Sequence, residues 1–94
     1  MNQLIARTNL SQFAGHALVG HVTNKTDVLD EFECQLKCMA NNSCKSFNIH
    51  PKGNHAKYIC ELNNTTRQMR PGDFNRKKGS TYFGSLQVSF KYIL

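Results

Sequence analysis

The chain has 94 residues, with 12 Lys or Arg against 6 Asp or Glu, so its formal net charge is +6. A chain of this length forms one domain with a modest core, and it contains no apolar run of about 18 residues that would predict a transmembrane helix. The common hydrolase, zinc-protease and phosphate-loop motifs are absent from the sequence, so we expect neither an enzyme nor a bound cofactor or metal.

The first predicted elements are strands. Residues 1–12 are mixed and polar, and we expect an edge strand or a loose arm. Residues 13–22, FAGHALVGHV, are apolar with two interrupting glycines, which is typical of a strand with a bend. Residues 23–27, TNKTD, have the composition of a turn.

A helix is predicted to begin after this turn. Asp30 followed by Glu33 fits a capping box, and Asp27 is an alternative cap. Acidic residues near the start of the helix favour either choice, because the helix dipole stabilises negative charge there. Asn41 and Asn42 are expected to end the helix, since asparagine tolerates the left-handed backbone at a C-terminus.

Two sets of side chains recur along the predicted helix at helical spacing. Cys34 and Cys38 lie four residues apart, so a helix places both thiols on one face. Phe32, Leu36 and Met39 recur at helical spacing and form an apolar stripe. We expect this stripe to be part of the core.

Two short strands are predicted after the helix. Residues 45–50, KSFNIH, and residues 58–62, YICEL, are β-branched and aromatic runs, and Pro51 ends the first. The loop between them is either a solvated hairpin end or a binding loop, because loops on a rigid scaffold often hold binding residues. Its candidate binding residues are Lys52, His55 and Lys57.

The next segment is the most basic part of the chain. Residues 63–80, NNTTRQMRPGDFNRKKGS, contain few apolar residues and are predicted to form a surface excursion without regular structure. Their basic residues are Arg67, Arg70, Arg76, Lys77 and Lys78. Such a cluster suits a sulfated or carboxylated polysaccharide or an acidic protein, and the planar arginine fork matches sulfate. The alternative is an ordinary solvated loop.

The chain closes with a strand signal. Apolar and polar residues alternate from Tyr82 to Tyr92, as in a half-buried antiparallel strand, and Gly84 is a candidate bend. We expect this strand to pair with the N-terminal strand and close the sheet.

The four cysteines have the spacing C-x3-C-x5-C-x15-C. Structural zinc sites usually pair two knuckles, or one knuckle with two nearby histidines. Here one knuckle is followed by two isolated cysteines, with His50 and His55 between them, so disulfides are favoured over zinc. A catalytic thiol is disfavoured, because it requires a lone activated cysteine.

The C-x3-C spacing, the Asn-rich gap, and the segments CKSFNI and ICELN together resemble the core of the PAN/apple domain family of extracellular binding modules. The resemblance is sharpest over residues 30–63. It implies an α+β fold, in which one helix packs across an antiparallel β-sheet and is pinned by the disulfides Cys34–Cys60 and Cys38–Cys44. Apple domains carry a third cysteine pair, which this chain lacks, so the two-disulfide PAN form is the closer match.

Disulfides indicate an oxidising compartment, and five N-x-[ST] sequons agree with an extracellular location. The sequons begin at Asn9, Asn24, Asn41, Asn63 and Asn64. The first residues are too polar for a signal peptide. We therefore expect residues 1–94 to be a single module excised from a larger secreted or cell-surface protein.

Two functions are consistent with these features. The first is a non-catalytic recognition module that binds carbohydrate, including acidic or sulfated polysaccharide, or a protein partner. The alternative is a structural or assembly module of an extracellular matrix or adhesive protein that acts by self-association. Nucleic acid is not expected as a partner, because no helix-turn-helix, zinc-finger or RNP motif is present and disulfides argue against an intracellular role.

Overall fold

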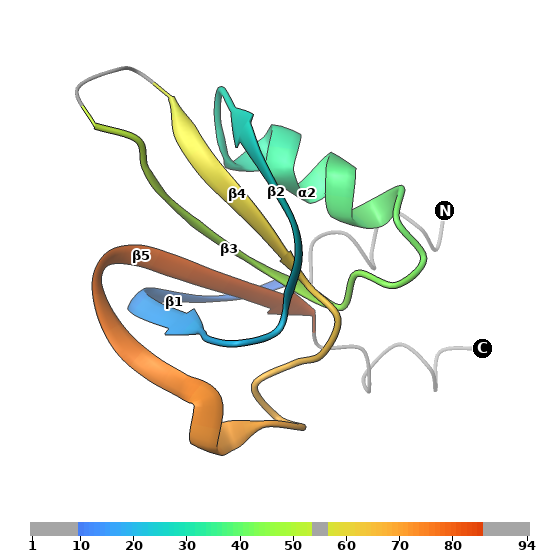
Figure 1. Ribbon diagram of the computed structural model, residues 1–94, viewed down its shortest axis with the longest axis vertical. Coiled ribbons are helices and arrows are strands. Elements are labelled where there is room, and N and C mark those ends of the chain that lie inside the picture. The colour runs from blue at the N-terminus through green and yellow to red at the C-terminus, as the bar shows by residue number, and fades with distance from the viewer. Residues whose placement is uncertain (1–9, 54–56, 86–94) are drawn as a thin grey trace.

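The structure of the chain is a computed structural model, which describes residues 10–53 and 57–85. Within these residues, a five-stranded antiparallel sheet has the strand order β1-β5-β3-β4-β2, and the helix α2 lies across a face of it (Figure 1). The elements are β1 (Leu10–Leu18), β2 (Val22–Val28), α2 (Glu31–Met39), β3 (Ser46–Pro51), β4 (Tyr58–Asn63), the 3₁₀ turn η1 (Pro71–Asp73) and β5 (Phe74–Ser85). The predicted α+β architecture is confirmed.

The start of α2 is a reciprocal capping box. The Asp30 side chain accepts a hydrogen bond from the Glu33 amide at 2.9 Å, and Glu33 Oε1 accepts one from the Leu29 amide at 2.8 Å. The first bond satisfies an amide that a helix start leaves without a partner, and the second ties the residue before the cap to the first turn. Asp30 is therefore the cap, and Asp27 has a different role.

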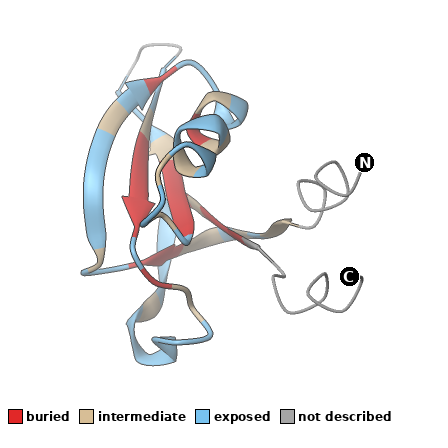
Figure 2. Cartoon of the chain, turned by 90° about the vertical axis from the view of Figure 1, so that its right-hand side faces the viewer, coloured by how far each residue is buried: buried red, intermediate tan, exposed pale blue. Residues whose placement is uncertain are grey.

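Two disulfides attach α2 to the sheet. Cys34–Cys60 joins the helix to β4 with a Cα–Cα distance of 5.5 Å, and Cys38–Cys44 joins it to the segment before β3 with a distance of 5.2 Å. Both expected pairings are confirmed. The buried residues lie on the central strands and beneath the helix (Figure 2). The core cluster comprises Val28, Cys34, Phe47, Ile49, Cys60, Leu62 and Phe83.

The apolar stripe of the helix is not core, which corrects the prediction made from its spacing. Phe32 is 59% exposed, Leu36 46% and Met39 52%. The disulfides turn the face that carries Cys34 and Cys38 towards the sheet. Because each helical residue advances by about 100°, the stripe lies on the far side.

Two segments that were predicted as irregular are strands. The TNKTD segment forms most of β2, an edge strand that pairs with β4. Residues 74–79, predicted as part of a surface excursion, form the first half of β5 and pair with the end of β1, with Leu18 opposite Phe74 and His16 opposite Arg76. Both segments can be strands although they are polar, because edge strands and exposed strands tolerate charge. Their backbone partners are distant in sequence.

The pairing between the N-terminal and C-terminal strands is confirmed over the described residues. Leu10 lies opposite Ser85 and Phe13 opposite Tyr82. The register shifts between Ala14 and His16, where Gly15 alone lies opposite residues 77–80 of β5. Gly15 and Gly79 have φ of 74° and 87°, which suits this bulge. The part of the predicted terminal strand beyond Ser85 lies outside the described residues.

Candidate ligand-binding surface

The segment between β4 and β5 is held to the sheet by one buried and one partly buried hydrogen bond. Ser46 Oγ donates to the Thr65 carbonyl at 2.7 Å, and the Arg67 amide donates to Tyr82 Oη at 3.0 Å. A turn follows, in which the amides of Met69 and Arg70 both donate to the Thr66 carbonyl. The segment therefore has a defined conformation, and so does its connection to the basic start of β5.

Arg67 packs on an aromatic cluster, which consists of Phe13, His16, Phe74 and Tyr82. Its guanidinium carbon lies 4.2 Å from the centre of the Phe13 ring and 5.8 Å from that of Phe74, within cation–π range. His16 stacks on Phe74 with ring centres 5.1 Å apart. The predicted ligand residue Arg67 thus also fixes the loop, and it brings a positive charge to the cluster.

Arg76, Lys77 and Lys78 lie in the first half of β5 and are exposed, as is Arg70 before η1. Arg76 lies opposite His16, so the strand pairing brings Arg76 and Arg67 to the same aromatic cluster. None of these basic residues forms an ion pair with any residue that the structure describes. Asp73, the acid of the same segment, contacts His21 at 2.8 Å. We call Arg67, Arg70, Arg76, Lys77 and Lys78 the basic surface.

The basic residues of β5 lie where this strand is irregular. The register with β1 passes from Arg76 opposite His16 to Thr81 opposite Ala14, so β5 has extra residues between these positions, Lys77 and Lys78 among them. Burial lowers the pKa of His50 on β3, and the positive charges of Lys77 and Lys25 add to this effect, against the opposing influence of Glu61. The charge of Lys77 therefore acts on the side of the sheet that carries Asn48, His50 and Glu61, which we call the polar side of the sheet.

The buried carboxylate of Glu61 is compensated within that polar side. His50 Nε2 lies 3.7 Å and Lys25 Nζ 3.8 Å from Glu61 Oε2. Asn48 Nδ2 donates to Glu61 Oε1 at 3.2 Å. This arrangement accounts for the acid as a satisfied structural group.

The basic residues near the β3–β4 hairpin end do not join the basic surface. Lys52 forms an ion pair with Asp27, and its hydrogen bond is the main cause that lowers the pKa of the Asp27 carboxyl, with a smaller contribution from the charge of Lys57. The hairpin end and the segment between β4 and β5 lie at opposite ends of the molecule (Figure 1). His55 lies outside the described residues.

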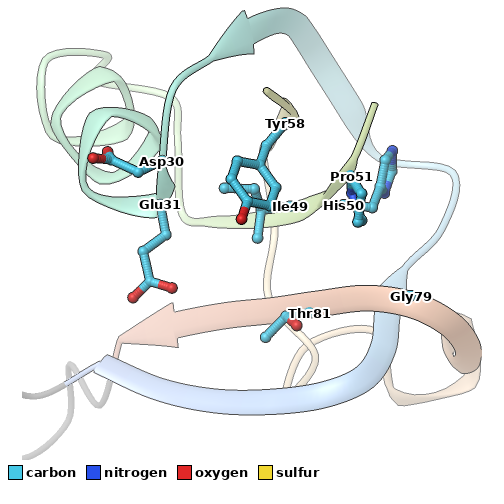
Figure 3. A pocket seen from close by; sticks show the side chains of 8 residues that line it. All are labelled: Asp30, Glu31, Ile49, His50, Pro51, Tyr58, Gly79 and Thr81. Carbon is cyan, nitrogen blue, oxygen red and sulfur yellow. The ribbon is translucent and has the colours of Figure 1, made fainter. Parts of the chain in front are cut away.

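A pocket of about 320 Å³ opens between the start of α2 and the sheet (Figure 3). Asp30 and Glu31 line it on the helix side, and Tyr58 and Thr81 line it on the sheet side. Its carboxylates repel an anion, so an acidic polysaccharide does not fit this pocket. The basic surface is the better candidate for such a ligand.

The structure also separates the candidate glycosylation sites. Asn63 is fully buried, and its Nδ2 donates to Ser46 Oγ at 3.1 Å, so a glycan there would have to displace a core side chain. Asn24 and Asn64 are exposed, and Asn41 accepts hydrogen bonds from Ser43. Asn9 lies outside the described residues.

The aromatic cluster is the part of the surface that sequence reasoning missed. Phe13 and Phe74 are 61 positions apart in the sequence, and their contact follows from the pairing of β1 with β5. The aromatic residues near the basic segment were visible in the sequence, but the sequence did not show which other aromatic residues they would contact.

Comparison with known proteins gives one match. The family model described as PAN domain matches residues 9–87. No curated protein and no solved structure matches the chain significantly. Over residues 10–53 and 57–85, no helix combines the length and the apolar character that crossing a membrane requires.

Proposed function

The chain belongs to the PAN domain family, and we propose that it is an extracellular recognition module that binds an acidic, sulfated or carboxylated polysaccharide. PAN domains are generally non-catalytic modules that bind proteins or carbohydrates, and they are typically extracellular and disulfide-bonded. We also propose that the chain is one module of a larger secreted or cell-surface protein.

The observation that carries this proposal is the uncompensated charge of the basic surface. In water, exposed like charges repel one another, and an anion that binds among them relieves this repulsion. Each contact with a sulfate or carboxylate adds a charge-assisted hydrogen bond. The cation–π contacts of Arg67 reduce the freedom that its side chain would lose on binding.

The geometry of β5 supports a chain-like ligand. Arg76, Lys77 and Lys78 are consecutive and exposed on β5, and a strand advances by about 3.3 Å per residue, so three cations lie close together in a row. A polysaccharide that carries repeated anionic groups can contact more than one of them at once. A single small anion can use only part of this row.

We expect replacement of Arg76, Lys77 and Lys78 by alanine to weaken binding to heparin by about tenfold or more, because three exposed charge contacts of up to about 1 kcal/mol each are lost. The side chains are exposed, so the melting temperature should change little. Binding can be measured by titration calorimetry at two salt concentrations. The affinity of the parent protein should fall as salt rises, since salt screens exposed charges.

A matched control removes the same number of charges elsewhere. Changing Lys37, Lys45 and Lys57, which are all exposed, to alanine alters the net charge equally but leaves the basic surface intact. Equal losses from both triple variants would show that net charge alone determines binding. Failure of the parent protein to bind heparin at low salt would reject the acidic polysaccharide and leave a neutral glycan or a protein partner.

A further inference from the structure

The outer side of α2 carries three large apolar side chains. Phe32, Leu36 and Met39 follow one another at spacings of four and three residues, which places them on one side of the helix. Phe32 is 59% exposed, Leu36 46% and Met39 52%. We call these three residues the apolar helix face.

The domain has no means of burying this face by rotating the helix. Cys34–Cys60 and Cys38–Cys44 attach the opposite side of α2 to the sheet at two successive turns. The apolar helix face therefore stays directed outwards. Contiguous exposed apolar patches of this kind mark interaction surfaces in soluble proteins.

We propose that the apolar helix face binds the same face of a second copy of this chain, with the two helices antiparallel about a twofold axis. This inference is independent of the proposed polysaccharide binding and uses a different surface. It also places on the helix the self-association that the sequence suggested as an alternative.

The positions of the apolar residues suit a twofold pair. The midpoint between Phe32 and Met39 falls between Gln35 and Leu36. An antiparallel partner centred there aligns Phe32 of each copy with Met39 of the other and places both Leu36 side chains next to the twofold axis. Each copy thus offers the same patch to the other, as a twofold interface requires.

The charges on the helix favour the antiparallel orientation. Glu33 and Lys37 are four residues apart and flank the apolar helix face on the same side. In an antiparallel twofold pair, this flank of one helix lies next to the same flank of the other helix, which runs in the opposite direction. Lys37 of one copy therefore lies beside Glu33 of the other. Among the residues that the structure describes, neither side chain forms an ion pair. Antiparallel helices also bring the acidic first turn of one copy to the basic last turn of the other.

The size of the face sets the expected strength. A helix of nine residues buries less than the roughly 800 Å² per partner of a standard stable interface. We therefore expect a dimer that dissociates on dilution, with a dissociation constant on the order of 10 to 100 μM.

Sedimentation velocity of the full chain without polysaccharide, from micromolar to millimolar concentration at physiological salt, tests the proposal. The parent protein should shift from monomer to dimer. Leu36→Glu should weaken association at least tenfold, because it buries a carboxylate at the centre of the interface. Met69→Glu is the matched control, since Met69 is 68% exposed on the segment between β4 and β5, and it should leave the dimer unchanged.

A charge series tests the orientation. Lys37→Glu should weaken the dimer by placing two carboxylates together. Adding Glu33→Gln, which retains an oxygen to cap the Leu29 amide, should restore part of that loss. A parent chain that stays monomeric at millimolar concentration, or equal effects of Leu36→Glu and Met69→Glu, would overturn the proposal. A monomer that dimerises only after residues 86–94 are deleted would overturn it too, because the chain's own end would then cover the face.

Discussion

Replacing Cys34 and Cys60 together by alanine is expected to lower the free energy of unfolding by about 2 to 5 kcal/mol. The bridge closes a loop with a sequence separation of 26, and both cysteines are fully buried in the core cluster. Its loss removes a constraint on the unfolded chain and leaves a small gap beneath the helix. Urea unfolding followed by circular dichroism measures the change.

The position of α2 is the reason for so large an effect. The apolar helix face points away from the sheet, so little apolar packing holds the helix in place and the bridges substitute for it. The second bridge is the natural control. Cys38→Ala with Cys44→Ala opens a separation of only 6 and should cost about 1 kcal/mol less. A Cys34/Cys60 variant as stable as the parent would show that the core alone holds the helix.

The cysteine pattern made the disulfide-pinned core predictable, because spacing along a helix decides which side chains share a face. C-x3-C placed two sulfurs on one side of α2, and the resemblance to PAN domains supplied their partners. The strand pairing at the two ends of the chain was predictable as well, since the alternation that begins at Tyr82 requires a partner strand.

Helical spacing could not show which side of α2 is buried. Phe32, Leu36 and Met39 have the periodicity of a core face, yet the bridged cysteines occupy the face that meets the sheet. Periodicity identifies a stripe, and the tertiary constraint decides whether water or protein covers it. The stripe that was predicted to be core is therefore the exposed surface that we propose for dimerisation.

The strands β2 and the first half of β5 were missed because their structure depends on distant partners. TNKTD and the FNRKKG segment have turn or loop composition, and β propensity depends strongly on context. Pairing with β4 and β1 determines their conformation. The basic residues were therefore predicted from the sequence, whereas their placement on a strand beside aromatic rings was not.

The largest loss of stability from a single substitution is expected for Asn48→Leu. The Asn48 side chain is fully buried on β3. Its Oδ1 accepts a hydrogen bond from the Leu18 amide at 3.0 Å, and its Nδ2 donates to the Leu18 carbonyl at 2.8 Å. The side-chain amide thus supplies the pair of hydrogen bonds that a neighbouring strand would provide, and it fastens the end of β1 across the sheet.

Leucine fills a similar volume but leaves both polar groups of Leu18 and one oxygen of Glu61 without this partner. Each buried group that loses its hydrogen bond costs about 1 to 3 kcal/mol, so we expect a total loss of roughly 3 to 5 kcal/mol in urea unfolding. Asn75→Leu, at an exposed position on β5, is the control and should change stability by less than about 0.5 kcal/mol.

The same substitution links the polar side of the sheet to the basic surface. Leu18 lies opposite Phe74, and His16 lies opposite Arg76, so the part of β1 that Asn48 fastens is the part that supports the basic half of β5. Under conditions in which the variant is still folded, Asn48→Leu should therefore weaken heparin binding although no basic residue has changed. Stability and affinity equal to those of Asn75→Leu would show that pairing with β5 alone holds β1 in position.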